Sequence, residues 1–153
     1  MQHVPIDPQA GVAAAPYKMA AELGCFKIDF LPSHPLNKFD NREDMLALLE
    51  EEPDWNLLLI PSVVQHLFHL AKHASLLTKL KPRSVLELAD TLALVRPQKS
   101  YILPYYLTNR EDARKLLYLK EEGDAYGFKK AHSIAYALII VLQLHLVKAG
   151  INL

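Results

Sequence analysis

IAYALIIVLQLHLV, residues 134–147, is the most apolar stretch of the chain and decides what kind of fold the chain can adopt. Gln143 and His145 are its strongly polar members. Its length of roughly 14 residues falls short of the ~20 that a helix needs to cross a bilayer. We therefore predict a buried core helix over residues 130–149, with Gly150 as its carboxyl-terminal cap.

Capping residues, prolines and glycines divide the chain before this helix into further short helices. Pro61 suits a first helical turn, where its missing N–H is not needed. We predict helices at residues 17–23, 42–52, 61–80, 85–95 and 110–122, the second capped by Asp40 with Glu43, the fourth by Ser84 with Glu87 and the fifth by Asn109.

Two short segments favour strands. Cys25–Phe30 alternates apolar and polar residues, which is the period of a half-buried strand. Trp55–Ile60 is a brief apolar run that also favours a strand, and residues 98–108 are expected to form a loop with three tyrosines. The fold class predicted is therefore mainly α (α+β), a helical domain with one or two short strands near the amino terminus.

Composition limits the possible classes of protein. The 153 residues allow one domain with a real core, and Cys25, the single cysteine, excludes an internal disulfide framework. Net charge is zero, but residues 1–71 carry four Lys/Arg and ten Asp/Glu, whereas residues 72–153 carry thirteen and seven. This layout fits an acidic, metal-binding end and a basic end that meets phosphate, although solvated faces explain the same counts.

Several groups of residues could form a catalytic or binding site, and each also has a purely structural interpretation. His66, His69 and His73 would share one face of a helix, where imidazoles can bind zinc or copper, but exposed helix histidines fit as well. Lys27 and Asp29 share one face of the predicted strand, either as a surface pair or as a carboxylate for a metal beside a lysine for phosphate.

The densest polar segment is YGFKKAHS, residues 126–133. Gly127 allows a tight turn, after which Lys129, Lys130 and His132 stand at the start of the predicted core helix. Free backbone N–H groups and the helix dipole make such a helix start attractive to anions. The segment is therefore a candidate phosphate site, or a basic helix entrance without a ligand.

Three motifs resemble the C-family bacterial replicative DNA polymerases, the alpha subunit of DNA polymerase III. YGFKKAHSIAYALI, residues 126–139, resembles the fingers motif of that family. LKPRSVLELADTLALVRP, residues 80–97, resembles its Leu-Lys-Pro-x-Ser run that ends in Arg-Pro-Gly-Pro. LGCFKIDFL, residues 23–31, resembles its palm strand. The three motifs occur in the family's order.

The resemblance implies a fold, a reaction and roles for individual residues. Asp29 would be the third palm carboxylate, catalytic and a ligand of magnesium in two-metal phosphoryl transfer. Residues 1–40 would be a palm-like remnant and residues 41–153 a helical fingers-like domain. The residues implied to bind nucleotide are Lys27, Arg96, Lys129, Lys130 and His132.

The sequence also departs from the family pattern, and these differences limit what the chain can do. The paired palm aspartates and the Gly-Ser-rich phosphate loop are missing from the sequence, and only 28 residues separate Pro97 from Tyr126. One carboxylate cannot hold two magnesium ions, so the chain is expected to be inactive alone. The resemblance implies a cytoplasmic split subunit of phage type, whose partners are a second chain with the remaining aspartates, DNA and deoxynucleotide triphosphates, with no membrane.

Two alternatives remain open at this point. The chain could be a non-catalytic, fingers-derived module that binds a replication protein or DNA. It could instead be a helical interaction or membrane-associated protein whose motif matches are coincidental.

Overall fold

The computed structural model describes residues 17–22, 24, 34–119 and 130–153. The chain divides into two compact units, Met1–Pro32 and Ser33–Leu153. In the first unit, helix α1 (Tyr17–Glu22) matches the helix predicted at residues 17–23. The predicted strand Cys25–Phe30 lies outside the described residues.

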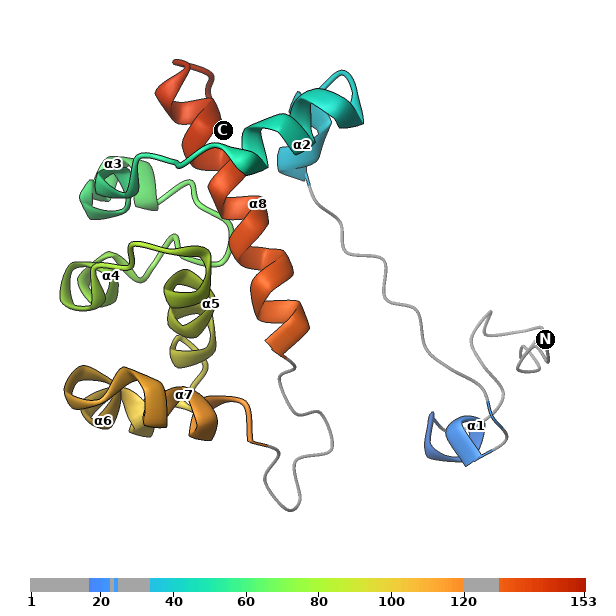
Figure 1. The fold of residues 1–153 in the computed structure, drawn as a ribbon, viewed down its shortest axis with the longest axis vertical. Coiled ribbons are helices and arrows are strands. Elements are labelled where there is room, and N and C mark those ends of the chain that lie inside the picture. The colour runs from blue at the N-terminus through green and yellow to red at the C-terminus, as the bar shows by residue number, and fades with distance from the viewer. Residues whose placement is uncertain (1–16, 23, 25–33, 120–129) are drawn as a thin grey trace. The chain divides into compact units, whose positions relative to one another are not determined.

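The second unit is built from helices, as predicted, and its described residues contain no strand. Short helices pack beside one long helix, α8, which runs through the unit (Figure 1). In chain order the elements are η1 (His34–Lys38), α2 (Arg42–Glu50), η2 (Trp55–Leu59), α3 (Pro61–Val64), α4 (Ala74–Leu80), α5 (Val85–Leu94), η3 (Ser100–Ile102), α6 (Leu103–Thr108), α7 (Arg110–Leu117) and α8 (Lys130–Lys148).

Helix α8 confirms the predicted core helix. Residues 139–146 are all buried, and α5 packs along it (Figure 1). Gly150, at φ 76°, ends the helix: its N–H bonds to Val147 O at 3.0 Å, and Ile151 N–H bonds to Leu146 O at 2.9 Å. These two bonds satisfy carbonyls that the helix end would otherwise leave unpaired.

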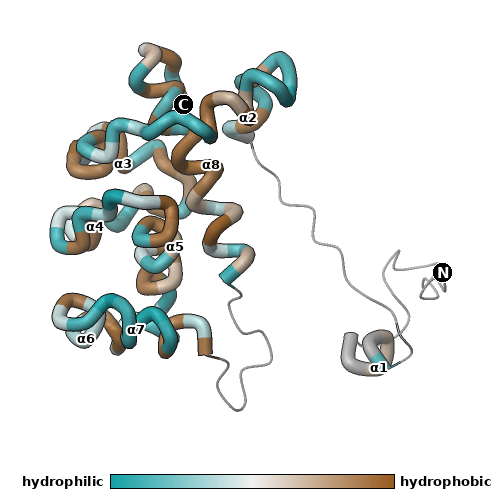
Figure 2. The backbone as a smooth tube through the Cα atoms, in the orientation of Figure 1, coloured by the Kyte–Doolittle hydropathy of each residue, from teal (hydrophilic) through white to brown (hydrophobic). Residues whose placement is uncertain are grey.

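By length and composition alone, α8 also qualifies as a membrane-crossing helix. Half of its most apolar window is buried inside the protein, and the core helix of a soluble protein meets the same criteria. Its hydropathy is high over most of its length (Figure 2). The helix is therefore weak support for a membrane span.

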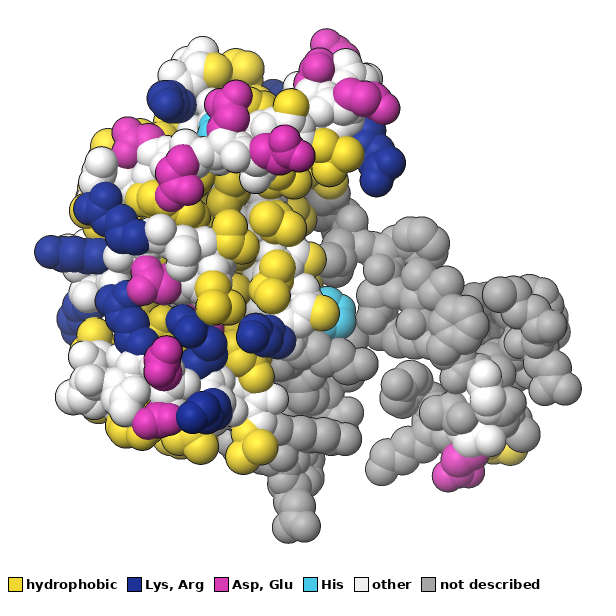
Figure 3. Space-filling view, viewed as in Figure 1, with side chains coloured by type: hydrophobic (Ala, Val, Ile, Leu, Met, Phe, Trp, Pro, Cys, Tyr) yellow, Lys and Arg dark blue, Asp and Glu magenta, His cyan; other side chains and the backbone are white. Residues whose placement is uncertain are grey.

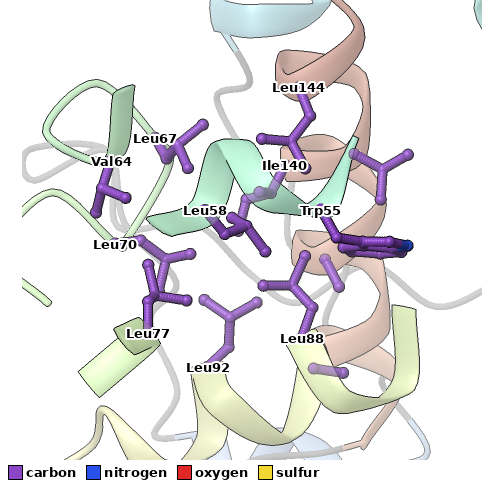
Figure 4. Packing of buried hydrophobic residues seen from close by; sticks show 13 residues of the cluster. Trp55, Leu58, Val64, Leu67, Leu70, Leu77, Leu88, Leu92, Ile140 and Leu144 are labelled. Atoms are coloured by element: carbon purple, nitrogen blue, oxygen red, sulfur yellow. The ribbon is translucent and has the colours of Figure 1, made fainter. Parts of the chain in front are cut away.

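The main core lies where α5, α8 and η2 meet. Leu88 and Leu92 of α5 converge with Ile140 and Leu144 of α8, and Leu58 of η2 fills the space between them (Figure 4). A second, smaller cluster joins the end of α4 and the carboxyl half of α5 to α6 and α7. Burying these apolar side chains fixes the axis of α8 relative to α5.

The predicted strand Trp55–Ile60 is wrong, because this run forms the 3₁₀ helix η2. Asp54 accepts a hydrogen bond from Asn56 N–H at 3.0 Å and starts the turn. Trp55 and Leu58, three residues apart, then point into the core together. The expected loop at 98–108 is likewise wrong, since η3 and α6 occupy it and Pro104 lies in the first turn of α6.

The single helix predicted over residues 61–80 is also wrong: α3 and α4 are separated by turns at residues 65–73. Within these turns His69 adopts φ 58°, which a right-handed helix does not allow. Gln143 of α8 accepts a hydrogen bond from Phe68 N–H at 2.8 Å and donates one to His66 O at 3.2 Å. A long-range side chain thus binds backbone groups that a continuous helix would pair internally.

The helix caps follow the prediction in two of three cases. Ser84 accepts a hydrogen bond from Glu87 N–H, and Asn109 accepts one from Asp112 N–H. In α2, however, Asn41 is the cap and accepts from Asp44 N–H at 2.8 Å, in place of Asp40. Helix α7 ends at Leu117, five residues before the predicted end at 122.

Candidate functional site

The structure brings only part of the sequence-predicted site together. Lys27, Asp29 and Lys129 lie outside the described residues. Lys130 and His132 both stand on the first turn of α8. Arg96 follows the end of α5 and lies close enough to His69 for its charge to affect that side chain.

Two contacts define the start of α8. The Lys130 ammonium lies 5.9 Å from the centroid of the Tyr118 ring, within the range of a cation–π interaction. Ser133 is buried, and its hydroxyl donates a hydrogen bond to Ala89 O of α5. The first turn of α8 is therefore tied to both α5 and the end of α7, while Lys130 remains exposed.

Asp90, in the middle of α5, is a completely buried carboxylate that the sequence analysis missed. It accepts hydrogen bonds from Tyr106 Oη at 2.8 Å, Arg114 Nε at 2.7 Å and Tyr118 Oη at 3.0 Å. A signal was present, because an aspartate within the apolar helix VLELADTLAL must be paired if it is buried. Its partners, however, come from segments 16 to 28 residues away.

The Asp90 network alters the titration of its members. Burial raises the pKa of Tyr106 and of Tyr118, and the neighbouring Asp90 carboxylate raises both further. Burial alone would lower the pKa of Arg114, but the hydrogen bond and charge of Asp90 outweigh it and raise that pKa. Both tyrosines therefore stay protonated and donate their hydroxyl hydrogens to Asp90.

Several cationic side chains lie close to the Asp90 network. Glu87, one turn before Asp90 on α5, pairs with Arg110, which also donates to Leu80 O at 2.8 Å. We call Arg110, Arg114 and Lys130 the basic strip. All three contact α5 or a partner of Asp90, and Lys and Arg side chains gather over α4, α5 and α7 on this face (Figure 3).

The basic strip suits phosphate better than a metal. Guanidinium and ammonium groups donate charge-assisted hydrogen bonds to phosphate oxygens. Within the described residues, no three His, Cys, Asp or Glu side chains are grouped so that they could hold a metal ion. Asp29, the residue that the resemblance implies for magnesium, lies outside the described residues.

The histidine face predicted as a possible zinc or copper site is not formed. His66, His69 and His73 lie in the turns between α3 and α4 rather than on one helix. His69 instead packs its ring against Phe68 and Tyr136.

Comparison of the chain with protein-family models, with curated proteins and with solved structures finds no match. The resemblance to C-family polymerases therefore remains a prediction from the sequence motifs.

Proposed function

We propose that this chain is a split or remnant part of a C-family DNA polymerase. It is inactive alone and contributes a phosphate-binding surface at the start of α8. In this proposal, a second chain supplies the remaining palm aspartates, Asp29 completes a magnesium-binding carboxylate set, and DNA and deoxynucleotide triphosphates are the ligands. The sequence motifs support the polymerase assignment, and the geometry supports phosphate binding.

The observation that carries the proposal is the position of Lys130. Its ammonium is exposed on the first turn of α8 and rests on the Tyr118 ring. Burial of residues 139–146 fixes the helix axis, so the positive end of its dipole stays beside Lys130 and His132. Lys130, His132 and the N–H groups of the first helical turn are the donors that a phosphate at this point could use.

The test is a titration of nucleoside triphosphate and of a DNA oligonucleotide at low salt. We expect Lys130→Ala and His132→Ala each to weaken binding by about 5- to 150-fold, because each charge-assisted hydrogen bond is worth roughly 1–3 kcal/mol. Added salt should weaken binding further. Lys148→Ala, at the far end of the same helix, is the matched control and should bind as the parent does.

If binding is unchanged in both variants, the start of α8 is a basic helix terminus that binds no phosphate ligand, and the proposal is wrong. The polymerase part of the proposal is tested separately by primer extension with magnesium. We expect no extension by the chain alone, and extension with the partner chain that is abolished by Asp29→Asn. Extension by the chain alone would contradict the split-subunit assignment.

A second candidate is a non-catalytic module that binds a replication protein or DNA. The Lys and Arg side chains that gather over α4, α5 and α7 favour it, because they could meet DNA phosphates without any catalytic group (Figure 3). Phosphate binding without any partner-dependent extension would support this candidate.

A further inference from the structure

Four aromatic rings form a row beside the start of α8. His132 and Tyr136 lie one turn apart on α8, with ring centroids 6.5 Å apart. The Tyr136 ring lies 4.9 Å from His69 and 5.5 Å from Phe68, and these last two rings meet edge-to-face at 4.2 Å. We call these four residues the aromatic row.

The aromatic row is anchored on one side and open on the other. Phe68 and Tyr136 pack against the main core cluster but are only partly buried. His132 is also partly exposed, and much of His69 is exposed. Rings supported in this way are held in place while parts of them remain accessible to a ligand.

Hydrogen bonds from a distant segment hold the turn that carries the Phe68 and His69 rings. His69 adopts φ 58°, a conformation that is unfavourable for residues with a Cβ atom. Gln143 accepts a hydrogen bond from Phe68 N–H and donates one to His66 O, and these two bonds hold the backbone that directly precedes His69. Local backbone preference therefore does not explain where the His69 ring lies, and long-range contacts do.

Cationic side chains occur near the aromatic row. Lys130 precedes His132 by two residues, and Phe68 forms one wall of a cavity of about 260 Å³ that Lys38 also lines. Arg96 lies near His69, and burial together with the Arg96 charge lowers the pKa of that imidazole. His69 is thus mainly neutral at pH 7, as a ring that stacks on other rings should be.

Aromatic side chains interleaved with cations are the arrangement that binds single-stranded nucleic acid without base-specific hydrogen bonds. Every base has a face that can stack, and cations meet the phosphates between the bases. An apolar peptide would gain from the rings but not from the cations, so charge complementarity favours a polyanion with exposed bases.

We propose that the aromatic row stacks unpaired bases of single-stranded DNA while Lys130, at the start of the helix that carries His132 and Tyr136, meets its phosphates. This inference rests on the proposed function, since it assumes that the start of α8 binds phosphate. It adds the ligand: a single strand with accessible bases.

The test compares two fluorescein-labelled strands in anisotropy titrations with the full chain. One is oligothymidylate of about twelve nucleotides, and the other is an abasic strand of equal length. We expect Tyr136→Leu to weaken binding of oligothymidylate by about 5- to 150-fold and to leave the abasic strand unaffected. Tyr136→Phe keeps the ring and should stay within about two-fold of the parent.

His69→Asn gives a second, independent variant. Asparagine tolerates the left-handed backbone but lacks an aromatic ring, so the turn should persist without the stacking surface. We expect weaker binding of oligothymidylate alone. Circular dichroism of each variant establishes that the helices are retained.

Each remaining outcome separates this inference from the proposed function. If both strands bind the parent and neither variant weakens oligothymidylate binding, the stacking surface is overturned and phosphate binding stands. Equal loss for both strands also overturns it, because stacking requires bases. If neither strand binds the parent, both proposals fail, and the exposed rings would serve another class of partner such as a protein.

Discussion

Arg114 Nε lies 2.7 Å from Oδ2 of Asp90, and the aspartate side chain has no exposed surface. The pair joins α7 to the centre of α5, and the hydroxyls of Tyr106 and Tyr118 complete the coordination of the carboxylate. Only one position of α7 against α5 satisfies all three of these hydrogen bonds to the buried carboxylate, so the network specifies that position.

Removing the Asp90 carboxylate should strongly destabilise the protein. Asp90→Ala leaves the Arg114 charge and two tyrosine hydroxyls without their acceptor, so we expect a loss of about 3–5 kcal/mol in the free energy of unfolding. Urea denaturation followed by circular dichroism measures this loss. Lys115→Ala is the control, because its pair with Asp112 is exposed and should contribute little. A similar midpoint for Asp90→Ala and the parent would contradict the structural role of the network.

Stability should fall in alkaline solution. Burial and the Asp90 carboxylate raise the pKa of Tyr106 and Tyr118 in the folded state above the value of about 10 expected in the unfolded chain. Above about pH 10 the unfolded state therefore binds fewer protons than the folded state, and the free energy of unfolding decreases as pH rises. Below that pH the contribution is fully present.

The pH dependence can be assigned with Tyr118→Phe, which keeps the ring beneath Lys130 but has no hydroxyl to titrate. Thermal unfolding across the alkaline range should show a shallower decline for this variant than for the parent. An identical decline would mean that Tyr118 titrates alike in both states.

Gln143 should control the turns between α3 and α4. Gln143→Leu leaves the N–H of Phe68 and the carbonyl of His66 without partners, so we expect a loss of about 1–3 kcal/mol. Hydrogen exchange should also quicken at Phe68 relative to α5. Gln143→Glu keeps the acceptor for Phe68 but places an unpaired carboxylate at a buried position beside the His66 carbonyl, and should be at least as unstable as the leucine variant.

The backbone at His69 predicts an order of stability between two variants. His69→Gly and His69→Ala both remove the ring, but only alanine keeps a Cβ atom at φ 58°. We expect the glycine variant to be more stable than the alanine variant by about 1 kcal/mol in urea denaturation. The reverse order would show that the turn rearranges when the ring is removed.

The core helix, most of the short helices and two of their caps could be predicted from the sequence. The reason is that these features depend on neighbours in the chain. The apolar run of residues 134–147 exceeds a single strand in length, Ser84 and Asn109 cap the residues that directly follow them, and Gly150 supplies the positive φ that ends α8.

Contacts between distant segments decided the features that sequence patterns did not predict. Trp55–Leu59 is apolar enough for a strand but coils so that Trp55 and Leu58 reach the core together. Residues 65–73 satisfy a helical pattern, yet Gln143, about 75 residues away, pairs with their backbone.

The candidate site divides in the same way. The sequence by itself determined that Lys130 and His132 stand at the start of a buried helix, because helix start and burial follow from the local run of residues. Only the tertiary structure decided that Tyr118 supports Lys130, that Asp90 holds Tyr118, and that the turns between α3 and α4 carry His69 to Tyr136. A buried charge and an exposed ring find their partners through packing, which brings together segments that no local pattern relates.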